Sequence, residues 1–532
     1  MNNKRNKVPR RPKPAAQGRK QTADMAKTAQ RRKHINVPYY LVLLLSLWAF
    51  CGWVYGGVFY MSEQCSYFAW DATLMHFLLQ QNLGFLKAAG RFLLLFYRYP
   101  VLGGLLLSSM LTLVVWLLCR IIPIPARFRG LTALIPFGFL AYFVGLNYSI
   151  NYHRETSWLF SLPLAALVIL AVAYLVKRWL APHSSAGKCG DKWYSSLVPV
   201  VLLAAFTTFC ALRRSDLITT CSLQRMVESR DWEEMTDKAL ACRQPSRSVA
   251  AYFAIALAET GQLQSRLFEL PFQYPHYKVR EMDGQKSDGV AIYSLDADFY
   301  AGIPNSSYHE SMEIMVKNGP QLFLLKKLAR AAAVNGEYRL CWKYLTIIDR
   351  NPFESGFTKR YREFLHHPRT IASDPEFRHV YAKLPVEDTF EQRYRKPLFM
   401  GYSTTLYAGR SFEALDASLM SLLYSKDQRG FLDRVRILSN TQLAPYYQQA
   451  VISYTLRDPN ILSQFPTIEK NMSLTRFQTF VREAQMYVSD MPRGEKELKA
   501  EWLNYYPYYL YFENLQTSTS THSNEKEKAG VN

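Results

Sequence analysis

The chain lacks the short motifs that mark most soluble enzymes. Its 532 residues contain no cysteine cluster with metal-ligand spacing, no glycine-rich phosphate loop, no nucleophile elbow and no zinc-protease motif. Strand signals, meaning alternating β-branched residues closed by Asn-Gly turns, are almost absent. Acidic residues are also scarce, with 43 Asp and Glu against 64 Lys and Arg. The sequence therefore predicts an all-α chain, and we expect no bound cofactor and no metal.

The excess of basic residues is confined to one part of the chain. Residues 1–36 hold twelve Lys and Arg and one Asp, and residues 37–213 hold twelve basic and four acidic residues. Residues 214–532 are nearly balanced, with 40 basic and 38 acidic side chains. A nucleic-acid-binding domain needs a basic face of its own, so we expect no nucleic-acid partner. Residues 1–36 and 516–532 have too few apolar side chains to fold and are expected to be disordered tails.

Long apolar runs dominate residues 37–213. A helix needs about 17–25 predominantly apolar residues to cross the hydrocarbon core of a bilayer. Five runs of this kind are nearly free of charged side chains: Val37–Tyr60, Pro100–Pro123, Gly130–Tyr148, Trp158–Val176 and Trp193–Leu212. We therefore expect a membrane domain of about five transmembrane helices at 37–213, whose partner is the lipid bilayer. The third run is the shortest and contains Pro136.

Basic residues in the short loops predict the orientation. Cytoplasmic loops retain Lys and Arg. The N-terminal tail and the loops after the second and fourth runs are rich in them, whereas residues 61–99 hold only three and residues 149–157 only one. This asymmetry predicts a cytoplasmic N-terminus and an extracytoplasmic C-terminal region. Apolar residues recur at helical spacing within 61–99, which indicates one or two amphipathic helices at the outer interface.

Residues 214–515 read as one helix after another. The clearest unit is Leu322–Pro352, which resembles a tetratricopeptide repeat, with Gly336 at its turn and Cys341 at the small-residue position of its second helix. Weaker helical patterns flank it at Cys221–Cys242, Ser248–Gly261, Phe412–Tyr424, Gly430–Leu438, Leu443–Leu456 and Leu474–Val488. Units of this length stack into a solenoid, and irregular helical packing is the alternative. Residues 281–306, rich in Asp, Gly and Ser, are expected to form an extended loop.

Two acidic residues in the first outer loop suggest an enzymatic alternative. Membrane-embedded transferases that use lipid-linked sugar donors carry an acidic base in this loop, and Glu63 and Asp71 occupy that place. The loop also offers basic side chains for a phosphate, His76, Lys87 and Arg91. His153-Arg154-Glu155 in the second outer loop is either part of the same site or a solvated turn. The alternative interpretation is that Glu63 and Asp71 only face water.

Two further constellations are interpreted as structural. Asp296-Ala297-Asp298 has the form of an acidic pair that holds a divalent metal, but it lies in the expected loop without a nucleotide-binding fold around it. We therefore expect a solvated turn there. His366 and His367 are adjacent, and adjacent side chains do not share a helix face. A shared metal is not expected at these histidines.

The cysteines divide by compartment. Three lie in apolar runs and one on the inner side: Cys51, Cys119, Cys210 and Cys189. Four lie outside, where disulfides persist: Cys65, Cys221, Cys242 and Cys341. Cys221 and Cys242 lie at nearly equal distances from the expected turn at Arg230-Asp231, so an antiparallel hairpin would place them opposite one another. The pattern predicts a possible disulfide between them, and the alternative is that each packs in the core.

The whole chain also resembles a family. The matching residues are Glu63-Gln64, Asn82-Leu83-Gly84-Phe85, Arg91-Phe92-Leu93, Phe96-Tyr97-Arg98-Tyr99-Pro100, Gly261-Gln262-Leu263 and Pro445-Tyr446-Tyr447-Gln448-Gln449-Ala450. They resemble an uncharacterised family of bacterial, chiefly Bacteroidetes, multipass inner-membrane proteins with a tetratricopeptide-like C-terminal region. The resemblance, over about residues 37–515, implies this architecture and location but no activity and no catalytic residues.

From these observations we expect a membrane-anchored scaffold or adaptor, not an enzyme. Its helical-repeat domain at 214–515 would bind protein partners at the cell envelope, because solenoids form extended concave surfaces suited to that use. The alternative is the lipid-linked transferase with Glu63 or Asp71 as its base. A transporter is disfavoured because the apolar runs show no internal duplication.

Overall fold

The computed structural model of the chain describes residues 36–122, 124–152, 154–180, 193–271, 279–280, 286–287, 291–385 and 411–512. Within these ranges the fold is all-helical, apart from β1 (Val279–Arg280) and β2 (Lys286–Ser287). These two short strands pair antiparallel, with Val279 opposite Ser287. The expected disordered tails lie outside the described residues, except for Asn36, and so do His153 and Cys189.

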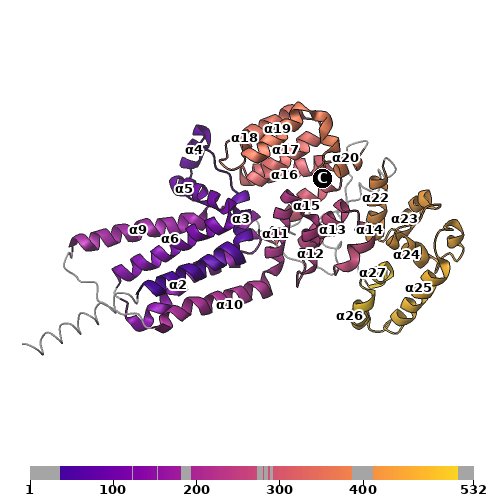
Figure 1. The fold of residues 1–532 in the computed structure, drawn as a ribbon, viewed down its shortest axis with the longest axis horizontal. Coiled ribbons are helices and arrows are strands. Elements are labelled where there is room, and N and C mark those ends of the chain that lie inside the picture. The colour runs from indigo at the N-terminus through magenta and orange to yellow at the C-terminus, as the bar shows by residue number, and fades with distance from the viewer. Residues whose placement is uncertain are drawn as a thin grey trace, which may run out of the picture. The chain divides into compact units, whose positions relative to one another are not determined.

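The chain divides into two compact units, coloured along the sequence in Figure 1. The first unit comprises Met1–Gly56, Tyr99–Gly145 and Leu159–Phe209. The second comprises Gly57–Arg98, Leu146–Trp158 and Cys210–Asn532. Each unit is therefore built from separate stretches of the chain.

The first unit consists mainly of apolar helices. These are α2 (Asn36–Ala49), α6 (Pro100–Ile121), α7 (Leu134–Gly145), α9 (Trp158–Leu180) and α10 (Leu197–Arg213). Three helical stretches are long and apolar enough to cross a membrane: Pro100–Ile121, Arg127–Gly145 and Trp158–Leu180. The number rises to five if each of two bent pairs is one span, namely Tyr39–Val54 with Gly56–Gln64 and Leu197–Arg213 with Ser215–Ser229. The five apolar runs of the sequence thus correspond to three helices and two bent pairs.

Close packing within the first unit depends on glycine. Helix α6 packs against α2 and against the π-helical turn Phe50–Val54 that follows it. A Cβ atom on Gly104 would lie 2.7 Å from the backbone of Gly52, which no real Cβ contact allows. Small residues permit this kind of backbone approach between apolar helices. After this π-helical turn the helical stretch bends by 65°, within the apolar run that the sequence predicted over Val37–Tyr60.

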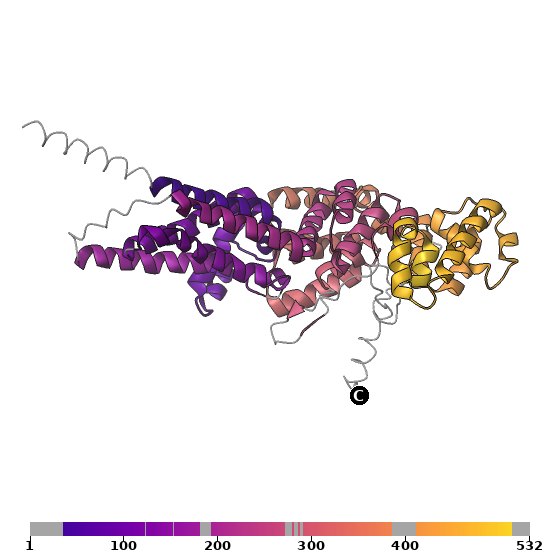
Figure 2. The ribbon, with the colours of Figure 1, turned by 90° about the horizontal axis from the view of Figure 1, so that it is seen from below.

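The second unit contains the remaining helices. Those before residue 270 are α3 (Gly56–Gln64), α4 (Ala72–Leu79), α5 (Gly84–Leu94), α8 (Ser149–Tyr152), α11 (Ser215–Ser229), α12 (Trp232–Leu240), α13 (Arg247–Glu259) and α14 (Leu263–Arg266). Those that follow are α15 (Ala291–Tyr300), α16 (Pro304–Asn318), α17 (Leu322–Val334), α18 (Tyr338–Ile348), α19 (Ser355–His366), α20 (Arg378–Ala382), α22 (Phe412–Tyr424), α23 (Gln428–Val435), α24 (Pro445–Tyr454), α25 (Lys470–Gln485), α26 (Met491–Trp502) and α27 (Tyr506–Phe512). Helices α15 to α19 contact one another in chain order (Figures 1 and 2).

Four helical hairpins of this unit share one turn geometry: α11–α12, α13–α14, α17–α18 and α22–α23. Each turn has one residue with positive φ, namely Arg230 (62°), Gly261 (68°), Gly336 (75°) and Lys426 (59°). The next N–H group donates to the carbonyl five residues back: Asp231 to Met226, Gln262 to Leu257, Glu337 to Ala332 and Asp427 to Leu422. This is the Schellman termination, in which a left-handed residue lets the chain leave the first helix and satisfies its last carbonyls.

The segment 281–306 differs from the expected loop. Its described part forms β2, α15 and the start of α16. The polar side chains that suggested a loop are paired: Ser294 donates to Glu310, and Ser306 donates to Asp298. Between them Leu295 and Phe299 are buried in the core. A helix is therefore stable here because each polar group finds a partner inside the fold.

Candidate functional site

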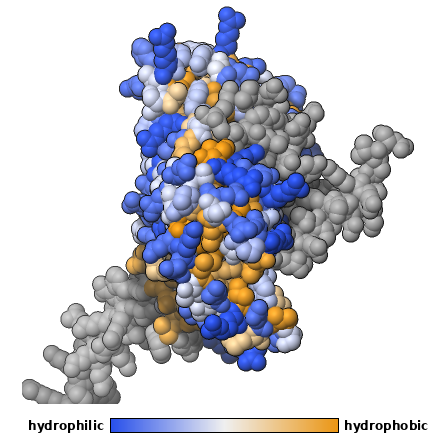
Figure 3. Space-filling model, turned by 90° about the vertical axis from the view of Figure 1, so that its right-hand side faces the viewer, coloured by the Kyte–Doolittle hydropathy of each residue, from blue (hydrophilic) through white to orange (hydrophobic). Residues whose placement is uncertain are grey.

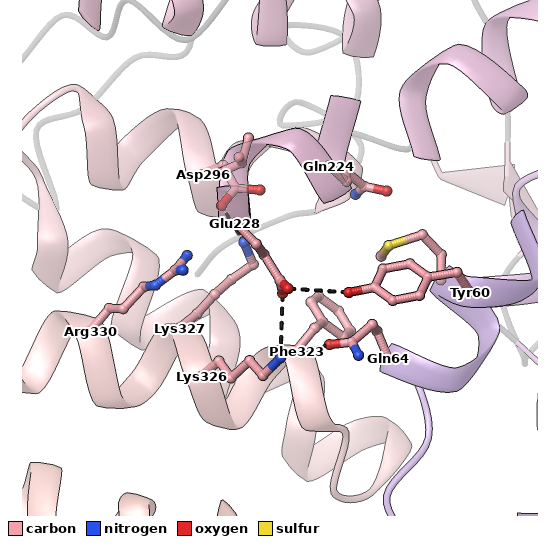
Figure 4. Close-up of a pocket in the computed structure, with 11 residues that line it drawn as sticks. Tyr60, Gln64, Gln224, Glu228, Asp296, Phe323, Lys326, Lys327 and Arg330 are labelled. Atoms are coloured by element: carbon pink, nitrogen blue, oxygen red, sulfur yellow. Dashed lines mark hydrogen bonds and ion pairs between the residues drawn. The ribbon is translucent and has the colours of Figure 1, made fainter. Parts of the chain in front are cut away.

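A pocket lies inside the second unit, where α3, α11, α15 and α17 meet (Figure 4). Its volume is about 420 Å³, counted with its open mouth. The residues that line it are Tyr60, Met61, Gln64, Gln224, Val227, Glu228, Asp296, Phe323, Lys326, Lys327 and Arg330. Charged side chains form much of the pocket wall. Charged residues are rarely buried without partners, so the partners of these side chains determine what the pocket can do.

Helix α17 supplies the three cations of this pocket. Its sequence is apolar around Lys326, Lys327 and Arg330, and almost the whole helix is buried. Residues three and four apart share a helix face, so Arg330 lies on the faces of both lysines. The apolar residues hold α17 in the core, and its cations are buried with it.

Lys326 joins three other segments. Its Nζ lies 3.0 Å from Oε2 of Glu354, just before α19, and 3.5 Å from Oε1 of Glu228 on α11. It also donates to Oε1 of Gln64 on α3, at 3.1 Å. Lys326 is 3% and Glu354 1% exposed. Burying such charges costs free energy that only close partners offset, so this network fixes the four segments against one another.

Arg98 completes the network from the end of the short 3₁₀ helix Leu95–Arg98. Its Nη1 lies 3.3 Å from Oε1 of Glu354 and donates to the Tyr60 hydroxyl at 3.0 Å. Tyr60 in turn donates to Oε2 of Glu228 at 3.2 Å. Burial by itself lowers the pKa of Arg98. The surrounding acidic groups, first Tyr60 and then Glu354, raise that pKa by a larger amount, so the net shift is upward. The arginine is firmly charged.

Lys327 and Asp296 form a second pair across the pocket. Lys327 donates to Oδ1 of Asp296, and the Tyr252 hydroxyl donates to Oδ2 at 2.9 Å. Burial lowers the pKa of Lys327, and Asp296 opposes that shift. Burial also raises the pKa of Tyr252 well above its usual value, with a further contribution from Asp296. Asp296 is thus held by a cation and a hydroxyl, which corrects the solvated turn that the sequence predicted.

Arg330 uses only part of its guanidinium in the protein. Its Nε lies 3.1 Å from Oε1 of Glu376 and 3.2 Å from the Tyr361 hydroxyl. Glu376 is shared with Arg360 at 2.9 Å. Neither Nη atom of Arg330 forms a hydrogen bond with a described residue, and Figure 4 shows the guanidinium directed toward Lys327 and Asp296. Arg330 therefore retains donors that face the pocket.

The two acids of the enzymatic alternative have different surroundings. Glu63 is 2% exposed and accepts a hydrogen bond from Nε2 of Gln64 at 2.7 Å, so it lies directly behind the pocket wall. Asp71 accepts from the backbone N–H groups of Thr73 and Leu74 and caps α4. These hydrogen bonds, first that from Leu74, lower the pKa of Asp71. The structure does not bring Glu63 and Asp71 together through any shared partner in the described chain.

Two of the three basic residues proposed to contact a phosphate near these acids, Arg91 and Lys87, bind other side chains. Arg91 binds Glu155 in a two-point ion pair, with Nη2 to Oε2 at 2.8 Å and Nε to Oε1 at 3.2 Å. Burial raises the pKa of Glu155, but Arg91 lowers it and determines the net direction. Lys87 donates to Gln81. The Arg91–Glu155 ion pair therefore joins the loop at 149–157 to the segment 61–99, and a site shared by the two loops stays a prediction.

The other candidate residues carry no site in the described structure. Cys221 and Cys242 are free thiols, so the disulfide is not formed here and stays a prediction for the oxidised protein. Cys221 is buried beside Asn151, whose Nδ2 lies 3.8 Å from its sulfur. No group of three His, Cys, Asp or Glu side chains suited to a metal occurs among the described residues, His366 and His367 included.

Of the residues that form the pocket, sequence reasoning singled out only Asp296 and missed the three cations. Lys326, Lys327 and Arg330 lie in the helix that matches the repeat pattern best, and that pattern is defined by apolar and small residues at other positions. The available signal was three cations at helical spacing in an otherwise apolar segment, because buried cations require partners. Those partners could not be identified from the sequence, since Gln64, Glu228 and Glu354 are far apart along the chain.

Comparison with known protein families assigns the chain to one of them. A family model matches residues 32–206 and 147–513, which together cover most of its length. The chain belongs to DUF6057, a family of unknown function. No curated protein and no solved structure matches it significantly. Membership in DUF6057 agrees with the expected resemblance to an uncharacterised family and brings no activity to the pocket.

Proposed function

We propose that this DUF6057 protein is a membrane-anchored scaffold or adaptor at the bacterial cell envelope. Its second unit would bind protein partners through tetratricopeptide-like repeats. The observation that carries the proposal is the Schellman turn that recurs in four helical hairpins, at Arg230, Gly261, Gly336 and Lys426. Hairpins with one turn geometry present equivalent faces when they stack, and stacked repeats bind extended segments of other proteins.

Exposed apolar side chains offer a surface for such a partner. In the C-terminal helices the large exposed residues include Phe412, Ile437, Leu456, Met472, Met486 and Val488. Figure 3 shows orange apolar side chains among blue hydrophilic ones on the face turned to the viewer. Exposed apolar surface commonly marks an interaction site when it is contiguous, and these side chains are the candidates for protein binding in this region.

The proposal places the apolar helices of the first unit in the inner membrane, with the N-terminus inside. The α4–α5 hairpin would lie at the outer interface. Trp70, Leu83 and Phe85 are each more than 60% exposed around this hairpin, at 71%, 63% and 77%. Helix α6, a candidate span, begins at Pro100, shortly after α5 ends at Leu94. Exposed apolar side chains that precede a candidate membrane span so closely along the chain are suited to the boundary between lipid headgroups and acyl chains.

The scaffold proposal is tested by crosslinked capture of the full-length protein from its native membranes. Leu456→Lys and Met486→Lys, introduced separately, place a charge among the exposed apolar side chains of the C-terminal helices. Val316→Lys places a charge at an even more exposed position on α16 and serves as the control. We expect the same partner set with the wild type and with Val316→Lys, and at least a tenfold loss with one of the other two. Unchanged partner recovery by all three variants would contradict binding at this surface.

The lipid-linked transferase is the second candidate, and one observation favours it. Gln64, which donates to Glu63, also lines the charged pocket, so this carboxyl group lies behind a wall that contains Lys326, Lys327 and Arg330. Replacing Glu63 and Asp71 by alanine separately discriminates the two functions. A transferase should lose transfer of a labelled lipid-linked sugar with Glu63→Ala and keep it with Asp71→Ala, because Asp71 caps a helix. A scaffold should retain its partners in both variants.

A further inference from the structure

We propose that Cys65 and Cys221 are joined by a disulfide bond in the mature protein. The choice of partners is argued from the structure of the second unit, and the oxidation rests on the proposed extracytoplasmic location of that unit. Both cysteines are free thiols in the structure, which therefore represents the reduced form. Both side chains are buried, Cys65 at 5% and Cys221 at 0% exposure.

An asparagine side chain connects the two helices that bring these cysteines together. Nδ2 of Asn151 lies 3.8 Å from Sγ of Cys221 on α11 and donates to the carbonyl of Val58 on α3 at 3.3 Å. The hydroxyl of Ser62, also on α3, donates to Oδ1 of the same asparagine at 2.6 Å. Cys221 is therefore directed toward the face of α3 that carries Val58 and Ser62.

Cys65 lies on that same face of α3. Its N–H group donates to the carbonyl of Met61 at 2.9 Å, so the helical hydrogen bonding continues through Cys65 just after the last residue of α3. Side chains three and four residues apart share a helix face, and Val58, Ser62 and Cys65 are spaced by four and then three residues. The helix face that meets Cys221 through Asn151 thus also carries Cys65.

The electrostatic surroundings of Cys65 agree with this placement. Burial raises the pKa of the Cys65 thiol well above its ordinary value, and the next largest contribution comes from Cys221. That contribution exceeds the one from the carboxyl group of Glu63, only two residues away along the chain. Because the interaction between two charges falls with distance, the two sulfur atoms lie near one another.

Cys242, the partner expected from the sequence, lies against a different side of α11. Its thiol forms a hydrogen bond with the side chain of Thr219. Thr219 and Cys221 are two residues apart, and side chains at this spacing do not face the same way on a helix. Cys221 is therefore directed away from Cys242, and the structure favours Cys65 as its partner.

Formation of the bond requires an electron acceptor. Each thiol loses one proton and one electron when the S–S bond forms, and the disulfide form of a thiol–disulfide oxidoreductase takes up both and leaves as a dithiol. The exchange passes through a mixed disulfide and needs access to a sulfur atom. Since both sulfur atoms are buried in the folded chain, the bond forms before the second unit has closed around them.

The bond would restrict an unusually long stretch of chain. Four of the five apolar runs lie between residues 65 and 221. A disulfide stabilises a fold mainly by restricting the unfolded chain, and the effect grows with the length of the closed loop. The bond would hold the segment after the first apolar run to the helix after the last run.

Peptide mapping of the full-length protein tests the pairing. Native membranes are treated with N-ethylmaleimide under denaturing conditions, and the protein is digested without reductant and analysed by mass spectrometry. We expect a linked peptide pair that contains Cys65 and Cys221. Alkylated thiols at both positions, or a peptide that links Cys221 to Cys242, would overturn the proposal if the second unit is extracytoplasmic.

Variants and a reductant provide the controls. Cys65→Ser and Cys221→Ser should each abolish the linked peptide, whereas Cys242→Ser should retain it. A phosphine reductant should lower the thermal midpoint of the purified wild type by several degrees and leave that of Cys65→Ser unchanged. An equal decrease in wild type and Cys65→Ser would assign the stabilisation to another bond and count against this one.

A reporter fused after Asn440 separates failure of the location from failure of the pairing. If the reporter is cytoplasmic, the proposed location is wrong, and the pairing is then decided on purified, reduced protein. Diamide, which takes up two electrons and two protons, is added just below the thermal midpoint, where local opening exposes buried thiols. Linkage of Cys65 to Cys221 would support the pairing, and its absence would overturn it.

Discussion

Lys326 connects four segments through one ammonium group. It contacts Gln64, Glu228 and Glu354, which belong to different parts of the second unit. A lysine in an apolar helix is destabilising by itself, because its charge loses hydration on burial. Here the partners are buried with it, so the residue specifies which segments meet.

Removing this cation should be strongly destabilising. Lys326→Met keeps the apolar stem but leaves Glu354 buried without its closest partner, at 3.0 Å in the wild type. Breaking a buried pair from one side costs about 3–5 kcal/mol, and we expect a loss of this order in the free energy of unfolding. Adding Glu354→Gln to Lys326→Met should recover part of the lost free energy of unfolding, because the buried group is then uncharged. A loss below about 1 kcal/mol in Lys326→Met, measured by denaturant unfolding, would show that the network does not hold the fold.

Glu259 provides a pH-dependent contribution. Burial raises its pKa to about 7, and Lys383, 3.9 Å away, only partly opposes this. Because the usual value is 4.5, the folded state binds the proton more tightly than the unfolded state. The stabilisation is therefore present below pH 4.5 and is lost as the pH rises from 4.5 to 7. Its size is about 3 kcal/mol, from 1.36 kcal/mol per pKa unit.

Glu259→Gln isolates this effect. The ionisation of Glu259 should lower the thermal midpoint of the wild type between pH 4.5 and 7. The thermal midpoint of Glu259→Gln should fall less over the same range. Glu363→Gln, an exposed carboxyl group on α19, should retain the wild-type slope. Identical pH profiles for wild type and Glu259→Gln would mean that the carboxyl group is not buried in solution.

At the scale of elements, the turns show how a few positions decide a hairpin. Gly336 has a φ of 75°, which glycine adopts without strain, whereas Arg230 occupies the same conformation with a side chain. Left-handed backbone costs a residue with a Cβ atom roughly 1–2 kcal/mol. The hairpin at Arg230 therefore adopts the same left-handed turn although the side chain of Arg230 makes that backbone conformation unfavourable.

Reciprocal substitutions test this conclusion. Arg230→Gly should raise the free energy of unfolding by about 1 kcal/mol, less the entropy that glycine adds to the unfolded chain. Gly336→Ala should lower it by a similar amount, although a Cβ atom would meet no atom closer than 4.0 Å. Differential scanning calorimetry measures both, and stability changes of the opposite sign would exclude the left-handed turn.

Helix α15 marks a limit of sequence reasoning at this scale. Its Asp and Ser residues indicated a loop, but Lys327, Tyr252 and Glu310 supply their partners from other helices. Asp and Ser side chains disfavour helices when they form hydrogen bonds with nearby backbone groups in place of the helical hydrogen bonds. Partners from elsewhere in the fold remove that competition, and local composition cannot reveal them.

At the scale of the whole molecule, the loop charges predict a topology. A reporter fused after Asn440 should be extracytoplasmic and one fused at Lys188 cytoplasmic, because basic loops remain inside. Alkaline phosphatase and green fluorescent protein fusions read the two sides in bacteria. Protease protection of the C-terminal region in intact spheroplasts would contradict the predicted orientation.

The sequence by itself determined the helical class, the apolar helices and many hairpins. Phe412–Tyr424 was expected from periodicity alone and forms α22 with the same bounds, because helix periodicity and turn residues are local. Only the tertiary structure decided the pocket. Lys326 and Arg330 are visible as cations in an apolar helix, but Glu354 lies beyond the next helix and Gln64 lies about 260 residues earlier. Charge pairing acts through space, so its partners are fixed by packing and not by spacing along the chain.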